Sequence, residues 1–251
     1  MKITVLGSSS GMAVPQRYPS AYLVESFGHL FLIDAGDGVA RQLAAYGKDC
    51  SRVESVCISH THPDHAGGLF TLLQTMHLAG RKTPLQIHMP GGILPGFNTV
   101  FPYFQIYREK WPFKFDLLPI SDGVVFETNG FQLAAVPNNH LEGNRPLAEK
   151  VGIGWDSYSF RLSEKKKAVL FTSDVPNLLH LRSVSSGVDA LLTECTHIRI
   201  EEILDFAETA EIPRVILTHI PQELENLSND KSMNHDSIKI EFALDGYAIE
   251  V

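Results

Sequence analysis

The sequence has few of the features that mark secreted and membrane proteins. Its 251 residues include three cysteines, Cys50, Cys57 and Cys195, with neither an even count nor a CxxC spacing. We therefore expect no disulfide framework and no thiolate zinc site. No stretch approaches the roughly 18 consecutive apolar residues of a membrane span, and the apolar run 3–7 is too short for the core of a signal peptide. A cytoplasmic protein without a membrane partner is expected.

Positive charge is also scarce. The chain has 21 Lys and Arg residues against 29 Asp and Glu residues, which gives a net charge of −8. Non-specific binding of nucleic acids draws most of its affinity from phosphate neutralisation by Lys and Arg, so this composition argues against it. The basic cluster 165–167 predicts a solvated turn between two strands. Because no linker rich in Gly, Ser or Pro divides the chain, we expect one domain over residues 1–251.

One short segment is unusually rich in groups that bind metal ions. It contains His60, His62, Asp64 and His65. It follows the apolar run 53–58, which predicts a short buried strand. The two histidines that lie two residues apart point the same way at the end of an extended segment, and Pro63 then turns the chain. So many ligands in one turn predict a metal site.

Further ligands follow other predicted strands. His140, Asp174 and His219 each stand just after an apolar run, at a position where layered α/β folds collect the residues of a site. The complete predicted set is His60, His62, Asp64, His65, His140, Asp174 and His219. These nitrogen and oxygen donors suit Zn²⁺, and also Mn²⁺ or Fe²⁺. Seven ligands are enough for two ions with open positions, so we expect a catalytic centre with two divalent metal ions.

The motif His-x-His-x-Asp-His at residues 60–65 resembles the signature of the metallo-β-lactamase superfamily of di-metal hydrolases. This resemblance implies an α/β fold of four layers, an αβ/βα sandwich. The superfamily's pattern assigns His60, His62 and His140 to one metal ion, Asp64, His65 and His219 to the other, and Asp174 to both. It implies hydrolysis by a metal-bound hydroxide that Asp64 would also orient.

Within the superfamily, several segments resemble the ribonuclease Z branch, which matures tRNA 3′ ends, and its phosphodiesterase relatives. Residues 33–38 resemble the branch's Asp-x-Gly-Glu-Gly turn. Residues 193–196 resemble its His-Glu-Ala-Thr motif, with Thr193 in place of the histidine. His197 falls where the branch carries a proton-donating histidine, and residues 245–250 are similar to its C-terminal strand.

Three further residues are assigned supporting or catalytic roles. Asp34 ends an apolar strand, so it is placed to accept a hydrogen bond from the metal-binding turn, as its counterpart in the superfamily does. The alternative is that Asp34 only forms the turn. Glu194 would orient His197 and keep it protonated, ready to donate a proton to a leaving oxygen. Alternatively, His197 caps the adjoining helix or lies on the surface.

The substrate is less closely defined by the sequence. The tRNA-processing enzymes carry an extra arm that grips tRNA in the interval between His140 and Asp174, whereas residues 141–155 predict a loop with Arg145 and Lys150 as its cations. We therefore expect a small or cyclic phosphodiester or a nucleotide as substrate. Alternatives are an arm-less tRNA 3′ endonuclease, a hydrolase of carboxylic esters, lactones or thioesters, and a non-enzymatic metal-binding protein.

Two other regions leave alternatives open. Residues 90–115 are rich in aromatic side chains and predict core packing, a lid over the substrate or the surface of a homodimer. Residues 7–11 predict a loop that borders the metal pocket or a plain turn. Strands are predicted at 2–6, 21–25, 29–33, 85–88, 123–127, 131–136, 157–162, 168–172, 190–194 and 215–217, and helices near 39–43, 69–78 and 200–208.

Overall fold

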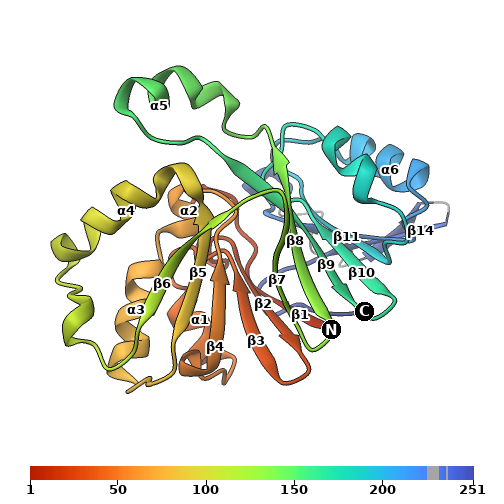
Figure 1. Ribbon diagram of the computed structural model, residues 1–251. Coiled ribbons are helices and arrows are strands. Elements are labelled where there is room, and N and C mark those ends of the chain that lie inside the picture. The colour runs from red at the N-terminus through yellow and green to blue at the C-terminus, as the bar shows by residue number, and fades with distance from the viewer. Residues whose placement is uncertain (225–231, 236) are drawn as a thin grey trace.

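A computed structural model describes residues 1–224, 232–235 and 237–251 (Figure 1). Within these residues the strands form two mixed sheets. The first sheet contains, in spatial order, β15 (Ala248–Glu250), β1 (Lys2–Gly7), β2 (Ala21–Ser26), β3 (His29–Ile33), β4 (Val53–Cys57), β5 (Leu85–Pro90) and β6 (Phe115–Ile120). The second contains β13 (Ser232–His235), β14 (Ile238–Phe242), β12 (Arg214–Thr218), β11 (Ala190–Glu194), β10 (Lys167–Phe171), β9 (Ser157–Glu164), β8 (Phe131–Asn138) and β7 (Gly123–Thr128).

The helices lie on the outer faces of the two sheets or beyond their edges. The α-helices of the described residues are α1 (Val39–Ala45), α2 (Pro63–Ala66), α3 (Leu69–Leu78), α4 (Leu94–Val100), α5 (Arg145–Val151) and α6 (Ile200–Thr209). The 3₁₀ helices are η1 (Cys50–Arg52), η2 (Gly91–Ile93), η3 (Phe101–Phe104), η4 (Arg108–Lys110), η5 (Glu142–Asn144), η6 (Leu179–Val184) and η7 (Gln222–Leu224). Figure 1 shows α1 and α3 beside the first sheet, α6 beside the second, and α5 projecting beyond both.

Three apolar layers hold this arrangement together. Alternate residues of each strand face opposite sides of a sheet. Between the sheets, Phe31 of β3 stacks on Phe131 of β8 with ring centroids 5.2 Å apart. On the outer face of the first sheet Leu32 packs in a cluster with residues of α1 and α3, and on the outer face of the second sheet Leu191 packs in a cluster with residues of α6. The predicted four-layer αβ/βα sandwich is confirmed.

The strands predicted at 21–25 and 29–33, and those at 123–127 and 131–136, form two hairpins, and the predicted lysine turn is confirmed. Phe27 and Gly28 join β2 to β3 with φ of 49° and 85°, and Asn129 and Gly130 join β7 to β8 with φ of 47° and 81°. Positive φ at both central residues is the conformation of a type I′ turn, whose twist matches that of the flanking strands. Lys165 is exposed in the turn between β9 and β10. The helices predicted at 69–78 and 200–208 correspond to α3 and α6.

In three places the structure differs from the sequence-based prediction. The short helix α2 forms where a turn was expected, and Pro63 starts it because its fixed φ suits the first helical position. Residues 141–155 are not a simple loop, since they contain η5 and α5, and Gly152, with φ of 73°, caps the C-terminus of α5. The strand expected over 245–250 is reduced to β15, because Gly246 turns the chain with φ of 87°.

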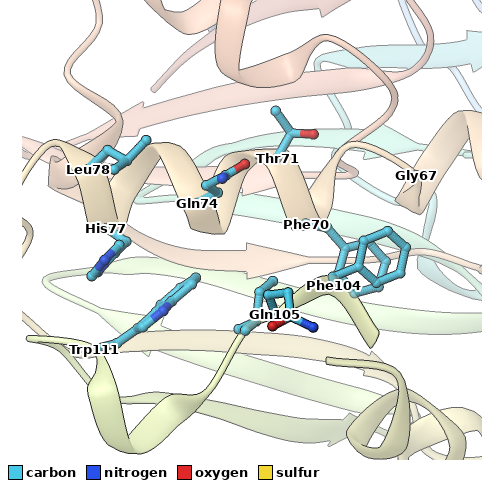
Figure 2. Close-up of a pocket in the computed structure, with 10 residues that line it drawn as sticks. Gly67, Phe70, Thr71, Gln74, His77, Leu78, Phe104, Gln105 and Trp111 are labelled. Atoms are coloured by element: carbon cyan, nitrogen blue, oxygen red, sulfur yellow. The ribbon is translucent and has the colours of Figure 1, made fainter. Parts of the chain in front are cut away.

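The aromatic segment, residues 90–115, is divided between core and surface. Its buried members include Phe101, Phe113 and Phe115. These pack in the cluster that covers the first sheet, so core packing holds for this part. Tyr103 and Phe104, by contrast, are 85% and 56% exposed. Phe104 stacks on Phe70 of α3 (Figure 2). Both rings line a cavity of about 490 Å³. For the exposed part, a lid over the substrate and the surface of a homodimer both stay predictions.

Cys50, Cys57 and Cys195 are buried as free thiols. None of the helices in the described part of the chain has the length and apolar character needed to cross a membrane.

Candidate metal centre

The predicted ligands converge at an edge where strands of both sheets end. His60 follows β4 of the first sheet, whereas His140, Asp174 and His219 follow β8, β10 and β12 of the second. The turn after β4 continues into α2, which carries Asp64 and His65. Segments far apart in the chain therefore meet at one place.

Three turns at this edge have an unusual backbone conformation. Asp34, Ser173 and His219 have φ of 58°, 51° and 48°. Residues other than glycine rarely adopt such positive φ values. Strain of this kind persists where the surrounding structure over-determines it, and it clusters at functional sites. Here the positive φ values occur at the predicted ligand His219 and at Ser173, directly before the predicted ligand Asp174. The third is at Asp34, which contacts the predicted ligand His65.

The seven predicted ligands form two groups that share one member. The first group is His60, His62, His140 and Asp174, and the second is Asp64, His65, Asp174 and His219. Within each group the potential ligand atoms all lie within 4.8 Å of one another. Asp174 belongs to both groups. The geometry therefore offers two adjacent places for a cation with a carboxylate between them.

Two buried atoms in this cluster have no hydrogen-bond partner within the described chain. They are Nε2 of His65 and Oδ1 of Asp174, which lie 3.2 Å apart. Buried polar atoms are almost always paired, so an unpaired donor or acceptor requires an explanation. An imidazole nitrogen and a carboxylate oxygen left in this state are suited to bind a common cation. The residues present thus fit a metal ion.

Hydrogen bonds behind the ligands fix which imidazole nitrogen faces the cluster. Asp34 is fully buried and lies 2.8 Å from Nδ1 of His65. It also accepts hydrogen bonds from the backbone N–H and the hydroxyl of Ser59. In the neutral ring, the proton held on Nδ1 leaves the lone pair of His65 on Nε2, where a metal ion would displace the second proton on binding. Asp34 is therefore placed where it can support His65, and this role stays a prediction.

The charges of the cluster also suit a cation. Burial lowers the pKa of His140 to about 4 and that of His60 well below its usual value, so both rings are neutral and able to act as ligands. The pKa of Asp174 lies well below its usual value because the charges of His65 and His219 outweigh its burial. The pKa of His65 is raised well above its usual value, since Asp174 and Asp34 outweigh burial. The buried carboxylates of Asp34 and Asp174 therefore stabilise positive charge in the cluster.

Glu194 and His197 form a pair beside the two groups. Nδ1 of His197 lies 3.0 Å from Oε1 of Glu194, whose other oxygen accepts hydrogen bonds from the backbone N–H groups of Thr196 and His197. The carboxylate is buried, whereas the His197 side chain is 39% exposed. Its ring centroid lies 5.0 Å from that of His140 and 6.3 Å from that of His219. The hydrogen bond to Glu194 raises the pKa of His197.

The family model described as "Anti-Pycsar protein Apyc1" matches residues 1–233. The chain belongs to this Apyc1 family. It is also 30% identical to the ribonuclease Z of Methanothermobacter thermautotrophicus over 270 aligned positions, 88% of this chain and 86% of that protein. A ribonuclease Z of Methanosarcina acetivorans is 31% identical over 140 residues, 56% of this chain and less than half, 45%, of that protein.

Two solved structures share the fold. The metallo-β-lactamase fold protein YhfI from Bacillus subtilis superposes with a TM-score of 0.76 at 20% identity, over 99% of this chain and 98% of that one. A diphosphatase from the PhnP family superposes with a TM-score of 0.74 at 19% identity, over 100% of this chain and 97% of that one. This member of the Apyc1 family has the metallo-β-lactamase fold and is a hydrolase related to ribonuclease Z.

In this Apyc1 family member, the cluster opens into a pocket of about 370 Å³. Its lining includes Ser10, Gly11, Met12, His62, Asp64, Asp174, Thr196, His197, His219, Pro221, Gln222 and Glu223. The loop at residues 7–11 thus borders the pocket, as one of the two interpretations of its sequence expected. A Cβ atom placed on Gly11 would lie 3.3 Å from Oδ2 of Asp64, so this loop passes close to the cluster.

Sequence reasoning missed three serines that support the ligands. Ser20 Oγ lies 2.9 Å from Nδ1 of His219. Ser59 Oγ lies 3.1 Å from Nδ1 of His60 and accepts a hydrogen bond from Ser173 at 2.7 Å. Ser59 could have been suspected because it precedes His60. Ser20 and Ser173 carry no signal of their own, since their contacts come from segments distant in the chain.

Replacing Asp34 by Asn is expected to weaken metal binding by about ten- to a hundredfold, the usual cost of losing a group that orients a ligand. The amide has no negative charge to hold the proton on Nδ1 of His65. Zinc affinity is measured by competition with a chelator of known strength. Asp37, exposed in the same turn, provides the control Asp37→Asn. Equal zinc affinity in the two variants would contradict the supporting role.

Proposed function

We propose that the protein is a di-zinc phosphodiesterase that hydrolyses a small phosphodiester or nucleotide. The observation that carries this proposal is the position of His197. Its ring lies near His140 of one ligand group and His219 of the other, the hydrogen bond to Glu194 raises its pKa, and part of it faces the pocket. A proton donor beside two cation sites is what cleavage of a phosphodiester with a poor leaving group requires.

We assign one zinc ion to each of the two ligand groups. His60, His62 and His140 would hold one zinc ion, and Asp64, His65 and His219 the other. Asp174 would contact both ions. When bound, two such ions lower the pKa of a water molecule and stabilise charge on the phosphate oxygens. We assign Asp64 the additional task of orienting the attacking water, because its side chain lines the pocket. The donor set also admits Mn²⁺ or Fe²⁺.

The surroundings of the pocket favour a small substrate over tRNA. None of the described residues that line it is Lys or Arg, and Glu223 adds a negative charge. The α5 projection offers little more, since Arg145 is paired with Glu142 and Glu149 on the same surface. A backbone with many phosphates would need cations to neutralise it. A substrate with a single phosphodiester group needs fewer.

Cleavage of tRNA 3′ ends is the second candidate, because relatives over most of the chain are named ribonuclease Z. Hydrolysis of a carboxylic ester, lactone or thioester is a third, since the same centre can activate water against a carbonyl group. A homodimer, one of the alternatives for residues 90–115, stays a prediction. It rests on the exposed aromatic side chains Tyr103 and Phe104 of that segment.

Hydrolysis of bis-p-nitrophenyl phosphate by protein of measured zinc content tests the proposal. We expect turnover that reaches its maximum at about two zinc ions per chain, is lost after chelation and returns with zinc. Precursor tRNA, a lactone and a thioester are assayed in parallel. Zinc-loaded protein that cleaves a carbonyl substrate but no phosphodiester would reject the proposal, and faster cleavage of tRNA would favour the second candidate.

A further inference from the structure

The loop between β1 and β2 supplies one side of the metal pocket. This Ser8–Tyr18 loop carries Ser10, Gly11 and Met12, which line the pocket together with His197 and Glu223. Gly11 comes so close to Asp64 that an added Cβ atom would lie 3.3 Å from its Oδ2 atom. A displacement of this loop would therefore change the space available to a substrate.

Both ends of the Ser8–Tyr18 loop are bound to one carboxylate from the other end of the chain. Oδ1 of Asp245 accepts hydrogen bonds from the backbone N–H of Ser8 at 2.9 Å and from its hydroxyl at 2.8 Å. Oδ2 accepts one from the backbone N–H of Tyr18 at 2.8 Å and one from Nε2 of Gln42 at 3.2 Å. Asp245 thus holds the two ends of the loop together and attaches them to α1.

The same loop ends are bound to the segment that carries His219. The backbone N–H of Ile220 donates to the carbonyl oxygen of Ser8 at 2.8 Å. Two residues after Tyr18, the hydroxyl of Ser20 lies 2.9 Å from Nδ1 of His219. The position of Asp245 is itself fixed, because the next residue, Gly246, donates its N–H to the carbonyl oxygen of Val5 at 2.7 Å.

We propose that Asp245 is a positioning residue that sets the place of the substrate-facing part of the Ser8–Tyr18 loop relative to the metal centre. It touches neither the pocket nor the predicted ligands, and acts through the two loop ends. The backbone N–H groups of Ser8 and Tyr18 donate to different side-chain oxygens of Asp245, so both oxygens must be acceptors, as they are in a carboxylate. Asparagine has the same size but offers one acceptor oxygen and an NH₂ group, which would face one of these donors. Asp245→Asn therefore removes the carboxylate's hydrogen bond at one end of the loop and loosens that end.

The matched control is Asp189, which also binds a backbone amide. It accepts a hydrogen bond from the N–H of Ala168 at 2.8 Å and from Nζ of Lys167 at 2.7 Å. These contacts lie where β10 begins, whereas Asp174 follows the point where β10 ends. Asp189→Asn thus removes a comparable structural carboxylate at the opposite end of the strand.

Hydrogen exchange on zinc-loaded protein without substrate tests the contacts themselves. Asp245→Asn should speed amide exchange in a peptide covering residues 8–18 by about tenfold or more, the factor that corresponds to 1.4 kcal/mol. Asp189→Asn should leave that peptide unchanged. Unchanged exchange in Asp245→Asn would overturn the proposal. This measurement does not depend on which substrate the enzyme hydrolyses.

Kinetics then test the consequence for the site, which rests on the proposed phosphodiesterase function. We expect Asp245→Asn to keep about two zinc ions per chain and to raise the KM for bis-p-nitrophenyl phosphate about tenfold, with a smaller change in kcat. Asp189→Asn should match the wild type in KM. An equal KM in both variants would overturn the positioning role, and loss of zinc in Asp245→Asn would make Asp245 a support of the metal ligands instead. Absence of phosphodiester turnover in the wild type would reject the proposed function while leaving the exchange result valid.

Discussion

His197→Ala is expected to separate substrates by their leaving groups. Hydrolysis of bis-p-nitrophenyl phosphate should be largely retained, because p-nitrophenolate leaves without needing a proton. Hydrolysis of a dinucleoside monophosphate should fall by about 10²–10⁴-fold, the usual contribution of a general acid. The structural basis is the Nδ1 hydrogen bond to buried Glu194, which holds the ring in place beside both ligand groups. The ratio of the two rates is the measurement.

The pH profile gives this prediction an independent check. The acid must carry its proton, so the rate with the poor leaving group should fall as pH rises through the pKa of His197. Because the hydrogen bond to Glu194 raises that pKa above the usual value, Glu194→Gln should move the fall to lower pH. The rate with bis-p-nitrophenyl phosphate should not show this shift.

A second histidine–carboxylate pair supplies the control. His29 lies 2.8 Å from Glu54 at the protein surface, on strands β3 and β4, and does not line the metal pocket. His29→Ala removes a comparable pair and should leave the ratio of the two rates unchanged. If His197→Ala lost both activities equally, or lost neither, the general-acid role would be wrong.

The ligand set could be predicted from the sequence because two kinds of signal coincide there. His60, His62 and His65 are neighbours in the chain, so their joint presence is visible without any fold. His140 and His219 are visible only because each follows an apolar strand, and strand ends in a layered fold meet at one edge. The four-layer fold, by contrast, was implied by the resemblance of residues 60–65 to the superfamily's motif.

Other parts of the site depend on contacts that no local pattern records. Ser20 binds His219 across nearly the whole chain, and Asp245 reaches Ser8 in the same way. A serine or an aspartate has many uses, and its role is decided by the partner that folding brings to it. The helix α5 was missed for a different reason. Within residues 145–151 only the side chain of Ala148 is buried. This segment therefore lacks the apolar face by which a helix is recognised in a sequence.

Asp174→Asn is expected to have the largest effect on metal content. Its two oxygens lie 3.2 Å from Nε2 of His65 and 3.4 Å from Nε2 of His219, and it is the one residue shared by both ligand groups of the described chain. The amide removes the negative charge that offsets two cations and replaces one donor oxygen by an NH₂ group. Asp174→Asn should therefore weaken zinc binding by both ligand groups.

The comparison that isolates this shared role is His140→Ala, which removes a ligand from the first group alone. We expect His140→Ala to keep about one zinc ion per chain and Asp174→Asn to keep well under one, with turnover of bis-p-nitrophenyl phosphate reduced by about 10³-fold or more in the latter. Zinc bound after dialysis is measured by elemental analysis, and the rise in Tm on adding zinc reports binding independently. A full zinc complement in Asp174→Asn would show that the two places are held separately, and each group would then have to bind its ion without a shared carboxylate.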